Sequence, residues 1–219
     1  MFSRYVLATA LVFAPIAAPG AAEAQKFSTV YQISLFGLPI AKSSFSGQIN
    51  GTDFIIDGAL RSSGIARVFD DTHGTTKVSG YVENASLVPI SYLLNYRSGK
   101  KNKSTLIGFS GGTVTKTVNT PELKIRKQGW IPVAKDDLTR VGDPLTSTLV
   151  KADGLRDVCN RTIRIYDGEM RSDLKLSYAG IKPFSTRGFS GDVVKCNARF
   201  IPVSGYRKGS SGTEYLRSK

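Results

Sequence analysis

Apolar and polar residues alternate along most of the chain, and this period of two limits its fold more than any other feature of the sequence. In residues 27–35 the larger side chains fall on every second position, with Ser28, Gln32 and Ser34 between them. Successive side chains of a strand point to opposite faces, so such a segment has one buried face and one solvated face. The pattern recurs in nine further segments: residues 41–49, 53–60, 75–82, 91–96, 104–109, 113–118, 161–166, 173–178 and 193–203. We therefore expect about ten strands.

Short turn motifs separate these segments. Asn50-Gly51, Gly111-Gly112 and Asp167-Gly168 each join two runs, and these residue types tolerate the positive φ that tight hairpin turns require. Successive strands joined in this way form antiparallel meanders, and the sequence has no strand–helix–strand alternation. It predicts a mainly β fold: a single antiparallel sheet that is curled or forms a partly open, β-spiral-like barrel, with one or two short helices. One of these is a single turn at residues 64–69.

The other predicted helix covers residues 143–150. Asp143 is a favourable N-cap residue, and Pro144 is favourable at the first helical position. Leu145 and Leu149 are four residues apart and would share one face of the helix. We expect this face to cover an open side of the sheet.

Residues 1–24 have the pattern of a secretory signal peptide. Arg4 provides the positive start, residues 5–18 form the apolar run, and Ala22-Glu23-Ala24 matches the small-x-small cleavage motif. The apolar run is shorter than the roughly 20 residues that span a bilayer, which disfavours an uncleaved anchor. We expect cleavage after Ala24 and a periplasmic protein with no transmembrane segment, in which residues 25–219 form a single β-rich domain.

Export would place the two cysteines of the chain in an oxidising compartment. An even pair usually closes in an oxidising compartment, so Cys159 and Cys196 are predicted to form a disulfide. The alternative is a reactive thiol with a resolving partner. Redox enzymes usually hold such a pair two residues apart at the start of a helix, and this pair is much further apart, which favours the structural bridge.

The excess of positive charge lies in the later part of the chain. The sequence has 30 Lys and Arg against 17 Asp and Glu; residues 25–96 contain five of each sign, and residues 97–219 contain 24 basic and 11 acidic residues. A field of this sign attracts anionic lipid headgroups, acidic glycans or nucleic acid, and export makes nucleic acid the least favoured of the three. A solvated surface that only confers solubility is the alternative. Two clusters supply the candidate anion-binding residues: Arg97, Lys100, Lys101, Lys103, Lys124, Arg126 and Lys127.

His73 is the only histidine, so any Ser-His-Asp or Cys-His catalytic device would depend on it. It follows Asp70 and Asp71, either of which could make it a general base, although Asp, Thr and Gly in succession are also ordinary turn residues. The adjacent carboxylates Asp70/Asp71 and Asp136/Asp137 would point to opposite faces of a strand and form no acid/base pair unless a loop reorients them, and we expect both pairs in solvated turns. The sequence also lacks phosphate-binding and dinucleotide-binding motifs, and it has too few His and Cys for a typical metal cage. We expect no catalytic residue, metal or cofactor.

Aromatic residues are plentiful in the predicted strands. Burial frequencies place such side chains in the core. If the sheet curls without closing, some of them would instead line a concave apolar groove able to hold an acyl chain or a lipidated partner. The residues concerned are Tyr31, Tyr81, Tyr92, Tyr96, Trp130, Tyr166, Tyr178, Phe184, Phe189 and Phe200.

Several short motifs give the chain a family resemblance. They are Ser63-Gly64-Ile65-Ala66-Arg67-Val68-Phe69, Asp143-Pro144-Leu145, Cys159 before a strand, Tyr166-Asp167-Gly168-x-x-Arg171, Asp173-Leu174 and Cys196-x-x-x-Phe200-x-Pro202-Val203-x-Gly205. With these motifs the chain resembles domain-of-unknown-function family 3108, a proteobacterial family of exported proteins. The resemblance covers most of the mature chain. It implies a mostly β protein with a curled sheet, like other envelope-integrity proteins, and it supports the Cys159–Cys196 bridge. It implies no catalytic residue.

Two functional hypotheses follow. The first is a non-enzymatic protein that maintains the cell envelope and binds a lipid, lipoprotein or anionic envelope component through a concave apolar face and a basic rim. The second is a hydrolase or transferase that acts on envelope glycans or lipids through His73. The shortage of catalytic groups in the sequence favours the first.

Overall fold

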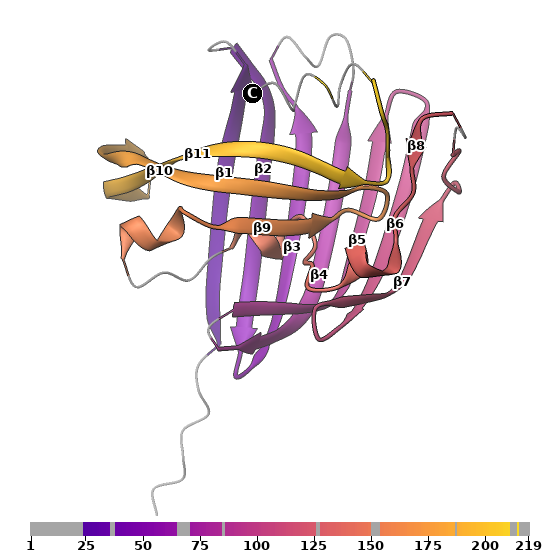
Figure 1. The fold of residues 1–219 in the computed structure, drawn as a ribbon. Coiled ribbons are helices and arrows are strands. Elements are labelled where there is room, and N and C mark those ends of the chain that lie inside the picture. The colour runs from indigo at the N-terminus through magenta and orange to yellow at the C-terminus, as the bar shows by residue number, and fades with distance from the viewer. Residues whose placement is uncertain are drawn as a thin grey trace, which may run out of the picture.

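Seven consecutive strands form the largest sheet of the molecule. The computed structural model describes residues 24–35, 38–64, 71–84, 86–125, 128–149, 154–186, 188–210 and 214. The seven strands pair in chain order, each antiparallel to the next (Figure 1). They are β1 (Gln25–Leu35), β2 (Leu38–Asn50), β3 (Asp53–Ser62), β4 (His73–Glu83), β5 (Ser86–Ser98), β6 (Lys101–Ser110) and β7 (Thr113–Thr120). Within the described residues, β1 and β7 do not pair with each other, so the sheet stays open.

A second sheet of three strands crosses one face of the first (Figure 1). Its order is β11 (Phe189–Ser204), β10 (Arg171–Thr186) and β9 (Thr162–Tyr166). The short strands β8 (Trp130–Ile131) and β12 (Tyr206–Arg207) form a separate pair, and three 3-10 turns complete the described structure: η1 (Lys135–Leu138), η2 (Thr146–Thr148) and η3 (Leu155–Val158). The predicted mainly β, antiparallel fold is confirmed, with its strands distributed over sheets of seven, three and two.

Glycine-containing turns join the strands as the sequence indicates. Gly51 lies between β2 and β3 with a φ of 60°, and Gly111 and Gly112 join β6 to β7 with φ values of 55° and 73°. At Gly111-Gly112 both central residues have positive φ, which matches the twist of the two flanking strands and lets the hairpin close in two residues. In the β2–β3 turn, Gly51 has positive φ and Thr52 does not.

The β10–β11 hairpin is longer than the sequence pattern indicates. Pairing continues past a bulge between Tyr178 and Ile181 as far as Thr186 and Phe189. Pro183 lies within this extension, where β10 has lost its pairing with β9 and is an edge strand. An edge strand tolerates proline because the missing N–H faces no partner.

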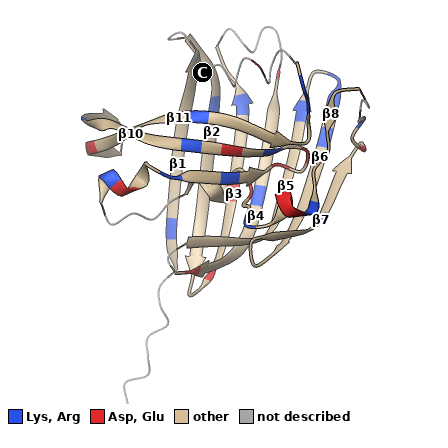
Figure 2. Cartoon of the chain, in the orientation of Figure 1, with Lys and Arg blue, Asp and Glu red and all other residues tan. Residues whose placement is uncertain are grey.

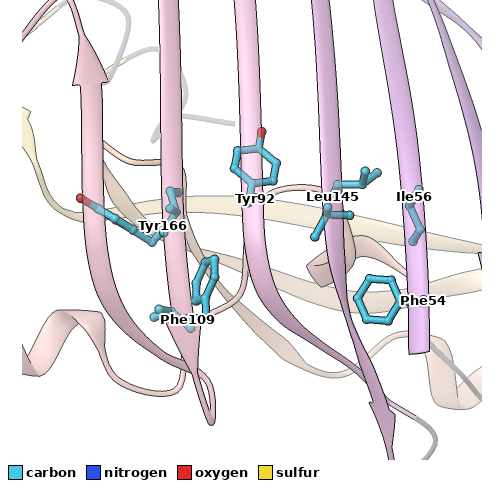
Figure 3. Packing of buried hydrophobic residues seen from close by; sticks show 9 residues of the cluster. Phe54, Ile56, Tyr92, Phe109, Leu145 and Tyr166 are labelled. Atoms are coloured by element: carbon cyan, nitrogen blue, oxygen red, sulfur yellow. The ribbon is translucent and has the colours of Figure 1, made fainter. Parts of the chain in front are cut away.

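The core lies between the two sheets. Alternate residues of the seven-stranded sheet point toward β9–β11, and we call this the inner face and the opposite one the outer face. Phe54 and Ile56 of β3 and Val78 of β4 are almost completely buried on the inner face. Other core residues come from β5, β6, the 141–145 segment and β9 (Figure 3): Tyr92, Ile107, Phe109, Val141, Leu145 and Tyr166.

Hydrogen bonds attach the second sheet to the first. The Asn119 side chain of β7 donates to the carbonyl of Gly168 in the β9–β10 turn (2.8 Å), and its carbonyl oxygen accepts from the Thr105 hydroxyl (2.7 Å). The backbone N–H of Gly142 donates to Arg164, and the N–H of Tyr166 donates back to Gly142 (both 3.0 Å). The preceding residue, Val141, donates its backbone N–H to the carbonyl of Gly112 in the β6–β7 turn (2.9 Å), so this segment bridges the two sheets.

The helix predicted at residues 143–150 is wrong in length and type. Only the single 3-10 turn η2 forms, and Leu149 already has an extended backbone (φ −92°, ψ 106°). Two threonines and a serine make up that turn, and their β-branching and competing side-chain hydrogen bonds disfavour a longer helix. Leu145 is buried in the core and Leu149 packs against it, as predicted. Val150, and residues 65–69 of the other predicted turn, lie outside the described residues.

The predicted disulfide is present. Cys159 follows η3 and Cys196 lies in β11, with their Cα atoms 5.8 Å apart. The bond joins the segment that enters β9 to the far strand of the second sheet.

Candidate functional site

An apolar pocket lies on the inner face of the seven-stranded sheet, next to the core. Its volume is about 360 Å³, at the lower end of the range for small-molecule sites. Strands β2 to β5 form its floor, and the segment before η2 covers one side. The lining residues are Ser43, Phe45, Gly58, Ala59, Leu60, Gly74, Thr75, Thr76, Tyr92, Leu94, Tyr96, Pro144 and Leu145.

Two glycines shape the floor in different ways. A Cβ at Gly58 would lie 2.6 Å from the Thr76 side chain and 2.9 Å from the Phe45 ring, so this position is already filled by its neighbours. The nearest atoms to a Cβ at Gly74 would be 3.8 Å away, on Leu60 and Asn95. Gly74 is therefore the position at which the lack of a side chain leaves room in the pocket.

The pocket is uncharged. Its lining contains hydroxyl groups but no Lys, Arg, Asp or Glu. Burial raises the pKa of Tyr92 to about 12, so this phenol stays neutral at any physiological pH. Such a site favours an apolar chain over a charged group because an unpaired charge is costly to bury.

The first predicted basic cluster, Arg97 to Lys103, is divided between the two faces of the sheet. In the β5–β6 pairing, Lys103 lies opposite Tyr96 and Lys101 opposite Ser98, which places both lysines on the inner, pocket side. Arg97 lies on the outer face, opposite Asn102. The Lys103 ammonium is 3.6 Å from the Glu169 carboxylate in the β9–β10 turn, an exposed pair of little energetic weight.

The remaining predicted anion-binding residues are spread more widely. Lys100 is exposed at the tip between β5 and β6, and Lys124 is exposed after β7. Arg126 and Lys127 lie outside the described residues. Of the candidates that the structure describes, Lys101 and Lys103 lie on the same face of the sheet as the pocket, and neither lines it.

His73 begins β4 on the outer face, away from the pocket. Its Nδ1 lies 3.7 Å from the Asp71 carboxylate and 3.4 Å from the Asp71 carbonyl. Its two neighbours in register are Arg61 and Arg97, and neither side chain is a nucleophile. Asp70 lies outside the described residues.

The Asp136/Asp137 pair belongs to a turn. Asp137 accepts a hydrogen bond from the backbone N–H of Ala134 (2.9 Å), which lowers the pKa of its carboxyl group. This carboxylate stabilises the start of η1, as acceptors at the first turn of a helix do.

The aromatic residues occupy several environments. Tyr92 and Tyr166 are in the core, as burial frequencies predict, and Tyr96 lines the pocket. Phe184 and Phe189 are exposed at the end of the β10–β11 hairpin, with ring centroids 6.4 Å apart. Phe45 also lines the pocket, and the other lining residues are small or aliphatic. The sequence marks most of the strand residues among them only by the parity that they share with the core, whereas Ala59 and Thr75 have the opposite parity.

In the part of the chain that the structure describes, no group of three or more His, Cys, Asp and Glu side chains could hold a metal ion. The same described residues contain no helix with the length and apolar character needed to cross a bilayer.

Comparison with known proteins identifies the family of the chain. No curated protein and no solved structure matches it. One family model does, described as "Protein of unknown function (DUF3108)", and it covers residues 30–216. This range includes the seven-stranded sheet from Val30 onward, the pocket and the second sheet. The chain therefore belongs to the DUF3108 family.

Proposed function

We propose that this protein is a non-enzymatic periplasmic protein of the cell envelope that binds the acyl chain of a lipid or lipoprotein in the inner-face pocket. The observation that carries the proposal is the pocket itself: an apolar, uncharged space that the sheet, Pro144 and Leu145 leave unfilled beside the core. Its Tyr92 stays neutral, which suits it to hydrocarbon and not to ionic chemistry.

The energetics of such binding are favourable. Each methylene group transferred from water contributes about 0.8 kcal/mol, so about eight of them contribute about 6 kcal/mol before the cost of ordering the ligand. Lys101 and Lys103 stand on the same side of the sheet and would lie near an anionic headgroup at the mouth.

Filling the pocket at Gly74 tests the proposal. A Cβ at Gly74 would make only ordinary van der Waals contacts, at 3.8 Å or more, and a β-branched residue suits a strand. Displacing about two methylene groups of ligand would weaken binding of a fluorescent fatty acid about tenfold. The matched control is Ser79→Val, on the outer face of the same strand, opposite Ile55. Equal affinities of the two variants and the wild type would refute the pocket as the binding site.

The proposed headgroup role of Lys101 and Lys103 is tested with a charged and an uncharged ligand of the same chain length. Lys101→Gln/Lys103→Gln is expected to weaken the binding of dodecanoate and to leave that of dodecanol unchanged, since only the former has a charge for them to meet. A parallel loss for both ligands would contradict a headgroup role.

The proposed location is tested separately. Fractionation of cells that express the full chain is expected to place it in the periplasm, and mass spectrometry to find Gln25 as its first residue. Full-length chain in the cytoplasm would contradict export.

A further inference from the structure

Basic side chains form a continuous row across the outer face of the seven-stranded sheet. In the strand register, Lys42 of β2 lies opposite Arg61 of β3, Arg61 opposite His73 of β4, and His73 opposite Arg97 of β5. Amide side chains continue the row at both ends. We call this set the outer row: Gln32, Lys42, Arg61, His73, Arg97 and Asn102. In Figure 2, where Lys and Arg are blue, blue segments lie side by side near one end of β2, β3 and β5.

The alternation of each strand places the outer row on the solvent side. Lys42, Arg61 and Arg97 are exposed, and each follows the parity opposite to that of the core residues of its strand. From β2 to β5 the row crosses three strand spacings, or about 14 Å. It therefore presents several positive charges in a line on the face opposite the pocket.

This arrangement opposes stability. Side chains directly opposite each other on neighbouring strands lie about 5 Å apart at Cβ, and like charges in such pairs repel. Among the described residues, no carboxylate forms an ion pair with Lys42, Arg61 or Arg97. The Asp71 carboxylate lies against His73. Three cations in one row without an ion-pair partner are better explained by a ligand than by folding.

The neighbouring row on the same face is mainly hydroxyl and amide in character. Its members in register are Val30, Ser44, Ala59, Thr75, Asn95, Ser104 and Thr120. Four members of this second row, Thr75, Asn95, Ser104 and Thr120, line an open groove of about 500 Å³. His73, Arg97 and Asn102 of the outer row line the same groove, and Tyr96 and Lys103 reach it from the inner face.

We propose that the outer row and this groove bind a linear acidic glycan. The row supplies charges for spaced carboxylate or phosphate groups, and the groove supplies hydroxyl and amide partners for sugar hydroxyls. A membrane is the less favoured anion because surfaces that bind bilayers carry apolar anchors beside their cations. Here five of the seven neighbouring side chains are polar, with Val30 and Ala59 the exceptions.

Purified protein and polygalacturonate, a sugar polymer with regularly spaced carboxylates, provide the test. Arg61→Gln/Arg97→Gln is expected to weaken binding about tenfold, as the loss of two charge contacts would. The matched control is Lys175→Gln/Arg199→Gln, which removes the same charge from an exposed, directly paired position of the second sheet. The control should bind within about twofold of wild type, and neutral dextran should not bind at all.

Two further measurements make the test decisive. Polygalacturonate should protect Arg61 and Arg97 of the wild-type chain from an arginine-specific dicarbonyl reagent, with the sites read by mass spectrometry, so the proposal can be judged even if the double variant does not fold. The melting temperature of Arg61→Gln/Arg97→Gln without ligand should equal or exceed that of wild type, because the change relieves repulsion.

Three results would overturn the proposal: equal losses in the row variant and the control, no protection of the two arginines, or row-dependent binding to phosphatidylglycerol vesicles without binding to polygalacturonate. The last result would assign the outer row to a membrane. Arg61 and Arg97 do not line the inner-face pocket, so the Arg61→Gln/Arg97→Gln variant should bind the fluorescent fatty acid like wild type, and failure of this proposal is distinguishable from failure of the acyl-chain proposal.

Discussion

Replacing Asp143 by alanine should destabilise the protein through the turn that covers the core. This side chain is completely buried. Its Oδ1 accepts from the backbone N–H groups of Leu145 (2.8 Å) and Thr146 (3.0 Å), and its Oδ2 accepts from the Thr146 hydroxyl. Each buried N–H left without an acceptor costs about 1–3 kcal/mol. Removal of a desolvated charge offsets part of this, so we expect a loss of about 2–4 kcal/mol in the free energy of unfolding.

Asp143→Asn separates the hydrogen bonds from the charge. The amide oxygen can accept from the same two N–H groups, so this variant should differ from wild type by no more than about 1 kcal/mol at neutral pH. Urea unfolding followed by circular dichroism measures both variants. A cost of less than about 1 kcal/mol for Asp143→Ala, or unfolding at the same urea concentration as Asp143→Asn, would contradict this role of the carboxylate.

The two variants also differ in pH dependence. Burial raises the pKa of Asp143 above its ordinary value of 3.8, in spite of the hydrogen bonds that lower it. Between that value and the raised pKa, the folded chain holds a proton that the unfolded chain has released, so the wild type loses stability as the pH rises through this window. Asp143→Asn lacks this contribution. Its stability relative to wild type should therefore improve as the pH rises from about 4, and a constant difference would contradict the raised pKa.

The remaining predictions concern the disulfide and one glycine. Cys159 and Cys196 are 37 residues apart in sequence, so the chain-entropy model assigns the bond about 4 kcal/mol. A reductant should lower the melting temperature correspondingly, and free thiols found by alkylation of the natively exported protein would refute the bridge. Gly205→Ala should be among the most destabilising single changes, because its φ is +77° and its Cβ would lie 1.9 Å from the Glu169 carbonyl oxygen. Gly209→Ala, with φ +74° and nothing within 4 Å, has the same backbone strain without the clash and should cost only about 1–2 kcal/mol. Similar melting temperatures for these two variants would show that the close approach at Gly205 is unimportant.

The local pattern was enough to predict the strands and several turns. The ten alternating segments correspond to ten of the twelve described strands, all but the short strands β8 and β12. The turns at Gly51 and Gly111-Gly112 lie where the sequence indicates. These features depend on interactions between near neighbours: the pleat repeats every two residues, and tight turns need residues that accept positive φ. The helix predicted from Asp143 and Pro144 was wrong because Thr146, Ser147 and Thr148 do not sustain it.

The sequence by itself determined the mainly β class, the alternation of buried and exposed residues, and the residue types available at each face. Only the tertiary structure decided how these are combined. The register of the sheet separates Arg97 from Lys101 and Lys103 and brings Arg97 into line with Arg61, which is 36 positions earlier in the chain. Packing of β9 and Leu145 over the inner face decides where the core ends and the pocket begins. Both depend on contacts between residues far apart in sequence, which a repeat of two residues cannot encode.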